Sequence, residues 1–439
     1  MTTTAMITTA TVCFPLGHHA RSCRFATTTA FLLLALAAPA ISSDWQQWRG
    51  PRGNGIADNA ATPQGKLPPV TFSKDENVLW QSAIPGRGHG SPTVVGNRIY
   101  LSTADDAKGT QSLLSIDRES GQIVWQEVLM TSQQLPEIHN KNTHASSTVA
   151  CDGERLFVTL YAQDSVWIHC RTIDGDAVWS RKLAPFRPKY PFGYAASPVL
   201  YGELVIATAE SEAETALIGL DRKSGKEIWR SPRPQNSSYS SPALLQVGGR
   251  QQLVISGGRQ ITAYDPGTGK QLWSAEGAAK HTAGTVTGEG DYVLASGGYP
   301  ESETTCIRAD GSGRIVWKNN QKSYEQSMIV HDGYVYAFTD KGVAFCWELR
   351  SGKEMWKQRL AGPVSSSPVL VGDRIYAGNE KGALFVFLAT PDRYVPLAEN
   401  QLGSDIFPTP TYLDGKIYAR VGFQEGQRRR EVLFCIGEK

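Results

Sequence analysis

Histidine and glutamate side chains recur at one position of a repeated segment, where they could bind a metal ion or a polar ligand. Eight segments of the chain place a run of Ser, Ala or Pro before a short apolar strand. Aligned on that run, they share a position that holds His89, His144, Ala195, Tyr239, His281, Glu325, Ser365 and Phe407. Imidazole and carboxylate groups suit a transition metal or the recognition of a small polar molecule. Whether a metal binds stays unknown at this point, because polar side chains that merely line a water-filled channel of the protein would have the same composition.

A loop ahead of the second segment supplies one more candidate. Residues 136–142 form a connection that is longer than its counterparts and contains His139. Loops on a rigid scaffold often carry binding residues. Since histidine changes its charge near neutral pH, binding through His89, His144 and His281 is expected to depend on pH between about 5.5 and 7.5. We therefore predict a ligand-binding surface, with no catalytic residue assigned, made of His89, His144, Tyr239, His281, Glu325 and His139.

These residues must be positioned by short β-strands, which belong to a unit that is repeated along the chain. A turn phrase, LIGLDRKSGKEIWR at residues 217–230, has six copies in the chain, each with a glycine four residues before its tryptophan. Such a glycine supplies the positive φ that a tight hairpin turn requires. The tryptophans are separated by 45, 54, 50, 44, 44 and 39 residues, and a period of this size indicates a repeat architecture. They are Trp80, which lacks the phrase, and Trp125, Trp179, Trp229, Trp273, Trp317 and Trp356.

The two ends of the array predict how it closes. With its turn phrase, each segment has four strands, the content of one propeller blade. The eighth segment stops after 431–435 without a turn phrase, and residues 78–81 around Trp80 supply the missing outer strand. We predict an all-β chain in which residues 78–437 form an eight-bladed β-propeller, with 78–84 paired to 431–436. The seventh blade, which has Phe385–Phe387 and Tyr394 in place of the phrase, is interpreted as degenerate.

The turn phrase resembles the tryptophan-docking repeat of PQQ-like eight-bladed β-propellers. That group includes quinoprotein dehydrogenases and the BamB-type propeller lipoprotein of the outer-membrane β-barrel assembly machinery. The resemblance covers residues 78–437 and implies that each tryptophan packs over the turn of the neighbouring blade. It implies little about activity, because the repeat is a structural device that carries no chemistry of its own.

The segments outside the array have different compositions. Residues 1–43 are predicted to be a signal peptide, with Arg21 and Arg24 ahead of the apolar run FLLLALA and a small-residue cleavage site. Cleavage or retention stays open. Residues 1–40 hold these two arginines and no acidic residue, so their removal changes the formal net charge from +2 to 0, which argues against a nucleic-acid partner. Residues 44–77 are predicted to be an irregular arm, with Trp45 and Trp48 packed on the outside of the main body.

The cysteines are explained by the repeat. Four of the five that follow residue 43 occupy the small position at the start of the turn phrase, where a small apolar residue fits under a tryptophan. They are Cys170, Cys306, Cys346 and Cys435. Equivalent positions of different blades lie far apart, so these four are not expected to pair. Cys151 is the exception, and a disulfide to Cys170 within one blade is geometrically conceivable.

Three functions are compatible with this reading. The favoured one is an exported, periplasmic or extracellular monomer that binds a protein or small molecule in the cell envelope, with no membrane span after signal cleavage. The alternatives are a PQQ-dependent quinoprotein oxidoreductase and a hydrolase or lyase that uses His89, His144 and His281, which are expected at the mouth of the central channel of the propeller. Enzymatic activity is left uncertain, and the non-enzymatic interpretation is preferred. No cofactor is predicted, although PQQ with Ca²⁺ stays possible.

Reconstitution with PQQ and Ca²⁺ is predicted to give no productive complex. The resemblance implies an adjacent-cysteine disulfide and a Ca²⁺ site in such enzymes, whereas this chain has no adjacent cysteines and no assignable ligand set. The measurement is a titration followed by absorbance and by dye-linked oxidation of alcohols and sugars. Stoichiometric reconstitution with dye reduction would overturn the prediction.

Overall fold

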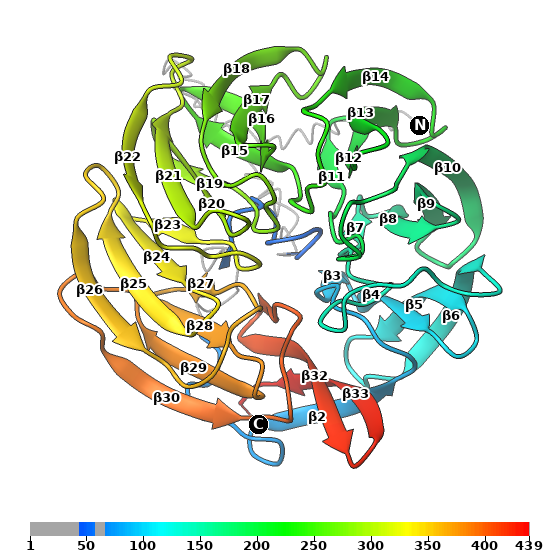
Figure 1. The fold of residues 1–439 in the computed structure, drawn as a ribbon. Helices are drawn as coiled ribbons and strands as arrows, with labels where there is room; N and C mark the ends of the chain where they lie inside the picture. Colours follow the sequence, from blue (N-terminus) through cyan, green and yellow to red (C-terminus); the bar gives the residue numbers. More distant parts are fainter. Residues whose placement is uncertain (1–43, 58–65, 439) are drawn as a thin grey trace, which may run out of the picture. The chain divides into compact units, whose positions relative to one another are not determined.

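The computed structural model describes residues 44–57 and 66–438, which form strands and connections and contain no helix. The predicted signal peptide lies outside these residues. None of the described residues forms a helix with the length and apolarity of a membrane span. The strands make eight sheets arranged in a ring (Figure 1), as predicted.

The sheets follow one another along the chain, and in each the strands run outward from the centre of the ring. The strands of blades 1 to 4 are β3 (Thr93–Val95), β4 (Arg98–Asp105), β5 (Thr110–Asp117), β6 (Ile123–Thr131), β7 (Ala150–Cys151), β8 (Arg155–Ala162), β9 (Ser165–Thr172), β10 (Ala177–Pro185), β11 (Val199–Tyr201), β12 (Leu204–Glu210), β13 (Thr215–Asp221), β14 (Glu227–Pro232), β15 (Ala243–Val247), β16 (Arg250–Gly257), β17 (Gln260–Tyr264) and β18 (Gln271–Glu276). Those of blades 5 to 8 are β19 (Thr287–Glu289), β20 (Tyr292–Gly297), β21 (Glu303–Arg308), β22 (Ile315–Asn319), β23 (Ile329–His331), β24 (Tyr334–Phe338), β25 (Val343–Glu348), β26 (Glu354–Arg359), β27 (Val369–Val371), β28 (Arg374–Gly378), β29 (Ala383–Leu388), β30 (Pro396–Gln401), β31 (Thr411–Leu413), β32 (Lys416–Glu425) and β33 (Arg428–Ile436).

The eighth blade is completed by the N-terminal strand β2 (Val78–Ile84). β2 pairs with β33 in antiparallel register from Val78 opposite Ile436 to Ile84 opposite Glu431. The predicted pairing of the two ends is therefore confirmed. Because a closed ring leaves no terminal blade, this pairing protects two sheet edges that would otherwise be free.

Strand pairing places each of the seven tryptophans opposite a small residue on the neighbouring strand. Cys435 faces Trp80, Cys170 faces Trp179, and Gly219 faces Trp229. The phrase glycines have the positive φ that the sequence predicts, for example 73° at Gly121. All five described cysteines are buried and free, so Cys151 and Cys170 do not form the disulfide considered above.

Most of these tryptophans rest on the turn of the next blade. A Cβ added to Gly121 would lie 2.5 Å from the Trp80 ring, and one added to Gly269 would lie 2.4 Å from Trp229. Trp125, Trp179 and Trp317 have the same relation to the phrase glycine that follows each of them. In the degenerate seventh blade, Thr390 offers its carbonyl oxygen to the Trp356 indole N–H at 2.8 Å.

Trp273 departs from the packing that the resemblance implies. Its indole N–H donates to Gln252 Oε1 of its own blade at 2.7 Å. The Gln252 amide nitrogen in turn donates to Ala309 O in the next blade, 3.2 Å away. A glutamine side chain thus bridges the two blades here, in place of the direct contact between an indole and a turn carbonyl.

A series of hydrogen bonds also links neighbouring blades at the mouth of the ring, just before their inner strands. The backbone N–H of Thr148 donates to Ser197 Oγ at 2.9 Å, and Ser197 N–H donates to Ser241 Oγ at 2.9 Å. In the same way, the backbone N–H of Ser91 donates to Thr148 Oγ1 at 3.0 Å. Blades 5 to 8 repeat the pattern through Thr285, Ser327, Ser367 and Thr409. These eight residues, called the hydroxyl ring below, are Ser91, Thr148, Ser197, Ser241, Thr285, Ser327, Ser367 and Thr409.

Residues 44–57 of the arm, which include Trp45 and Trp48, lie at the centre of the ring and not on the outside, so this expectation was wrong (Figure 1, dark blue segment). Trp45 is 2% exposed and exchanges two backbone hydrogen bonds with Val94 of β3. Gln46 O accepts from Cys151 N–H, and Gly55 O accepts from Leu370 N–H. The strand β1 (Ile56–Ala57) then pairs in parallel with β27, the inner strand of blade 7. Buried backbone groups require partners, and the arm supplies them to inner strand edges that face the channel.

Replacing Trp229 by Ala is predicted to cost about 3–5 kcal/mol of folding free energy, because a buried indole and its contact with the Gly269 turn are lost together. Denaturant melts of the purified chain would measure this loss. Ile228→Ala is the matched control, since the adjacent Ile228 side chain is 51% exposed and its truncation is expected to change stability little. A loss below about 1 kcal/mol for Trp229→Ala would show that its packing contributes little.

Candidate functional site

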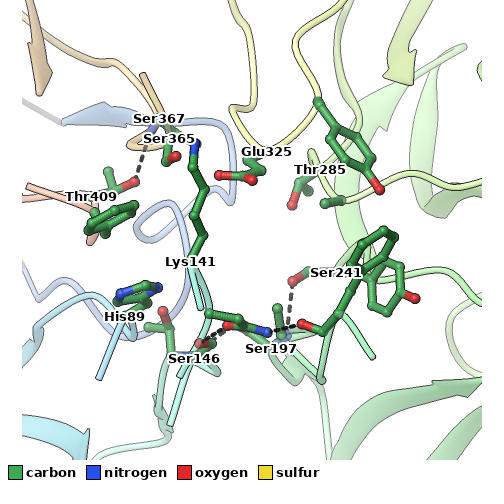
Figure 2. A pocket seen from close by; sticks show the side chains of 18 of the residues that line it. His89, Lys141, Ser146, Ser197, Ser241, Thr285, Glu325, Ser365, Ser367 and Thr409 are labelled. Carbon is green, nitrogen blue, oxygen red and sulfur yellow. Dashed lines mark hydrogen bonds between the residues drawn. The ribbon is translucent and has the colours of Figure 1, made fainter. Parts of the chain in front are cut away.

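A cavity of about 280 Å³ lies at the mouth of the ring (Figure 2). Each blade contributes to its wall from the segment that precedes its inner strand. The wall also receives Trp48 from the arm, and His139, Lys141 and Asn142 from the loop before blade 2. The inner strands continue from the cavity toward the arm, so the cavity opens at the mouth and has the arm beneath it.

Four of the six predicted site residues line this cavity: His89, Tyr239, Glu325 and His139. Their role in binding stays a prediction. His144 and His281 do not line it. The hydroxyl ring explains the difference, because it aligns Thr148 and Thr285 with Ser91 and Ser327. The positions equivalent to His89 are therefore Ser146 and Ala283, two residues after the histidines that we had chosen, and both line the cavity.

His144 and His281 instead hold the rim together. The His144 ring lies between Asp106 Oδ1 at 2.9 Å and Pro136 O at 2.8 Å, so it ties the loop before blade 2 to a hairpin of blade 1. His281 Nδ1 contacts Ser237 O at 2.7 Å, and its ring packs on Tyr190 and Tyr299. Both imidazoles have structural partners, so neither is available to form the predicted ring of histidines.

The loop 132–143 reaches across the mouth. Lys141 Nζ forms an ion pair with Glu380 Oε1 of blade 7 at 2.9 Å, and Figure 2 shows its side chain crossing the cavity toward Ser365 and Glu325. Asn142 Nδ2 donates to Phe192 O at 2.6 Å on the other side. Sequence reasoning selected this loop for its length but missed Lys141, since nothing in the local sequence connects it with Glu380.

Aromatic side chains form part of the cavity wall. His89 stacks on Phe407 with ring centroids 4.7 Å apart and planes 9° apart. Across the mouth, Phe192 packs edge-on against Tyr239 at 5.7 Å. The Trp48 indole N–H donates to Thr285 Oγ1 at 2.8 Å, which fixes the indole against the hydroxyl ring. Trp48 was missed as a site residue because the arm was expected on the outside.

Two carboxylates at the mouth, Glu380 and Glu325, differ in whether a cation is paired with them. Glu380 accepts from Ser365 Oγ at 2.7 Å as well as from Lys141. Glu325 opens into the cavity, and no described Lys, Arg or His forms an ion pair with it. Desolvation by the cavity walls raises the pKa of Glu325, and the negative charges of Glu380 and Asp340 add to this effect. Ser365 and Lys141 oppose the rise in pKa and do not cancel it.

His89 is held in its neutral form. Desolvation lowers its pKa well below the usual value, and the positive charges of Arg87, Arg420 and Arg429 act in the same direction. Arg420 and Arg429 are both paired with the buried Glu431. Desolvation also lowers the pKa of His281, so neither histidine favours the expected pH dependence of binding near neutrality, which stays a prediction.

The chain is similar to known proteins over most of its length. A family described as "Outer membrane protein assembly factor BamB" matches residues 70–187, 139–358 and 305–392. The chain belongs to this family. The outer membrane protein assembly factor BamB of Bordetella pertussis is 23% identical over 351 residues, which cover 76% of this chain and 81% of the relative. A polyvinylalcohol dehydrogenase of a Pseudomonas species is 23% identical over 288 residues, covering 62% of this chain and 40% of that enzyme.

Solved structures share the fold. BamB from Moraxella catarrhalis has a TM-score of 0.57 at 17% identity, covering 81% of this chain and 99% of that chain. Quinohemoprotein alcohol dehydrogenase from Comamonas testosteroni has a TM-score of 0.63 at 13% identity, covering 90% and 81%. At these identities the likeness concerns the fold, so any chemistry must be argued from the cavity itself.

The His89 ring is predicted to stay neutral from pH 5.5 to 7.5. Because its folded pKa lies below the unfolded value of about 6.5, its contribution to stability is complete above that pH and decreases as the pH falls below it. Imidazole ¹⁵N shifts across a pH titration would follow the ring directly. In His89→Phe, which keeps the stacking on Phe407, the loss of stability at low pH should be smaller. A His89 midpoint near 6.5 would contradict the prediction.

Proposed function

We propose that this BamB-family chain is a non-enzymatic binding propeller of the cell envelope that takes its ligand, or a segment of a partner protein, in the mouth cavity. The observation that carries the proposal is a cavity with a floor from the protein's own arm and a wall that differs from blade to blade. Ligand sites in proteins are typically concave and largely apolar, with a few polar groups that orient the ligand. This cavity has that composition.

The two ends of the ring differ in how much they offer for recognition. The end opposite the mouth carries the turn phrases, which are similar because most of them support the same tryptophan. At the mouth, equivalent positions hold His89, Tyr239, Glu325 and Phe407. Varied side chains around a rigid frame give specificity, so we assign binding to the mouth and the loop 132–143.

The envelope location rests on two separate observations. Residues 1–43 have the composition of an export signal, and the family is described by a role in outer membrane protein assembly. A protein partner in the periplasm is consistent with both. We expect the chain to act as a monomer.

A quinoprotein oxidoreductase is the second candidate, because a relative is named as a polyvinylalcohol dehydrogenase. The cavity wall does not suit PQQ, which carries three carboxylates. Lys141 is the wall's lysine and is already paired with Glu380, while Glu325 adds negative charge. The hydrolase or lyase hypothesis is weakened as well, since His144 and His281 lie outside the cavity wall.

Photocross-linking from the cavity tests the proposal. A benzoylphenylalanine placed at Phe407 should give adducts in envelope extracts, whereas the same probe at Tyr201, near the opposite end, should not. Ala195→Trp, which puts an indole into the cavity, should abolish the adducts from position 407.

Ala177→Trp is the matched control, because Ala177 is exposed beside a turn phrase at the opposite end. It should leave the adducts unchanged, and thermal melts should show both tryptophan variants folded. Adducts of equal yield from position 201, or adducts that survive Ala195→Trp, would place the binding surface elsewhere.

A further inference from the structure

We infer that the mouth cavity recognises a small organic cation, an ammonium compound whose charged head is held beside Glu325. This inference rests on the proposed function and names the ligand class of the same site. It combines the charge balance of the wall, its aromatic faces and the position of Lys141.

The charge balance leaves one carboxylate without a cation. Glu380 and Glu325 both approach Lys141, but the ion pair at 2.9 Å is with Glu380. The neighbouring Asp340 is paired with Lys322 at 3.2 Å. Three carboxylates therefore share two lysines, and His89 adds no positive charge. Glu325 lines the cavity and is exposed to it, so its carboxylate is free to accept charge-assisted hydrogen bonds from a ligand cation.

The aromatic faces suit the remainder of such a ligand. Trp48, Tyr239, Tyr324, Phe192 and Phe407 all line the cavity. Aromatic faces attract ammonium groups through the ring quadrupole, most strongly where water is excluded. Carboxylate and aromatic walls together are the usual means of holding a cation that carries alkyl groups. A volume of about 280 Å³ limits the ligand, or the inserted part of a partner, to a small molecule or a single side chain.

The side chain of Lys141 already places an ammonium group beside the carboxylates at the mouth. It enters the cavity from the loop 132–143 and places a primary ammonium at the acidic side, where Ser365 also donates to Glu380 (Figure 2). Lys141 thus acts as an internal alkylammonium. A ligand cation would be repelled by Lys141, so removal of this charge should strengthen cation binding. An anionic ligand requires the opposite response.

The hydroxyl ring would contact the other end of the ligand. The oxygens of Thr148, Ser197 and Ser241 accept N–H groups of the neighbouring blades, which leaves their O–H groups as donors. These donors line the cavity and can bind ligand oxygens or water. An ammonium compound with a hydroxyl group, such as choline, matches both ends.

Calorimetric titration with four probes tests the inference on the full mature chain. The cations are choline and cadaverine; 3,3-dimethylbutan-1-ol is the neutral counterpart of choline, and succinate is the anion. We expect at least one cation to bind and the neutral and anionic probes not to bind. Glu325→Gln should weaken cation binding about tenfold or more. Lys141→Gln should strengthen it about threefold.

Glu119→Gln and Lys226→Gln, at exposed positions of the turn phrases, are the matched controls and should change nothing. Succinate binding that is lost in Lys141→Gln would overturn the inference, as would binding of the neutral probe with equal affinity or no binding of either cation. If cross-linking from position 407 nevertheless depends on the open cavity, the proposed function stands and only the ligand class is wrong.

Discussion

The inner edges of the eight sheets impose the constraint on which the rest of this structure depends. An innermost strand has a neighbour on one side only, so its other edge presents backbone N–H and C=O groups to the channel. Near the mouth, the hydroxyl ring meets this need, because a Ser or Thr oxygen of one blade accepts the N–H of the blade before it. Deeper in the channel the arm does so, through Trp45, Gln46 and Gly55. Since buried polar groups must be paired, the ring of hydroxyls and the central arm are two solutions to one requirement.

This division separates structural from functional positions within a few residues. At six of the eight hydroxyl positions the side-chain oxygen accepts the N–H of another blade, and an apolar side chain there would remove this link. Two residues earlier, the side chain on the same face points into the cavity and carries no such obligation. That position holds a histidine in blade 1, a tyrosine in blade 4, a glutamate in blade 6 and a phenylalanine in blade 8. The site is therefore built where the frame places no demand on side-chain type.

The sequence was sufficient for the frame and less so for the site, for reasons that particular residues make clear. The Trp and Gly of the turn phrase are in fixed local register, so blade number and the β2–β33 closure could be predicted. The mouth alignment failed at His144 and His281 by two residues, a slip that keeps a side chain on the same face of a strand. Only hydrogen bonds between blades, such as Thr148 to Ser197, fix that register. The arm and Lys141 were missed because their partners are remote in sequence, with Leu370 and Glu380 more than 200 residues away.

The same frame can serve different chemistry because the mouth is electrostatically independent of it. This chain shares its fold with quinoprotein dehydrogenases at 13% identity, yet its cavity contains a carboxylate without an ion-pair partner and a lysine that is already engaged. An anionic cofactor would be repelled by the negative charge of Glu325, whereas a cation would be attracted by it. Neither Trp229 nor the hydroxyl ring takes part in that choice. The sign of the ligand is decided by a few charged side chains at the mouth, and these are the residues that a frame built on tryptophans, glycines and hydroxyls leaves free to change.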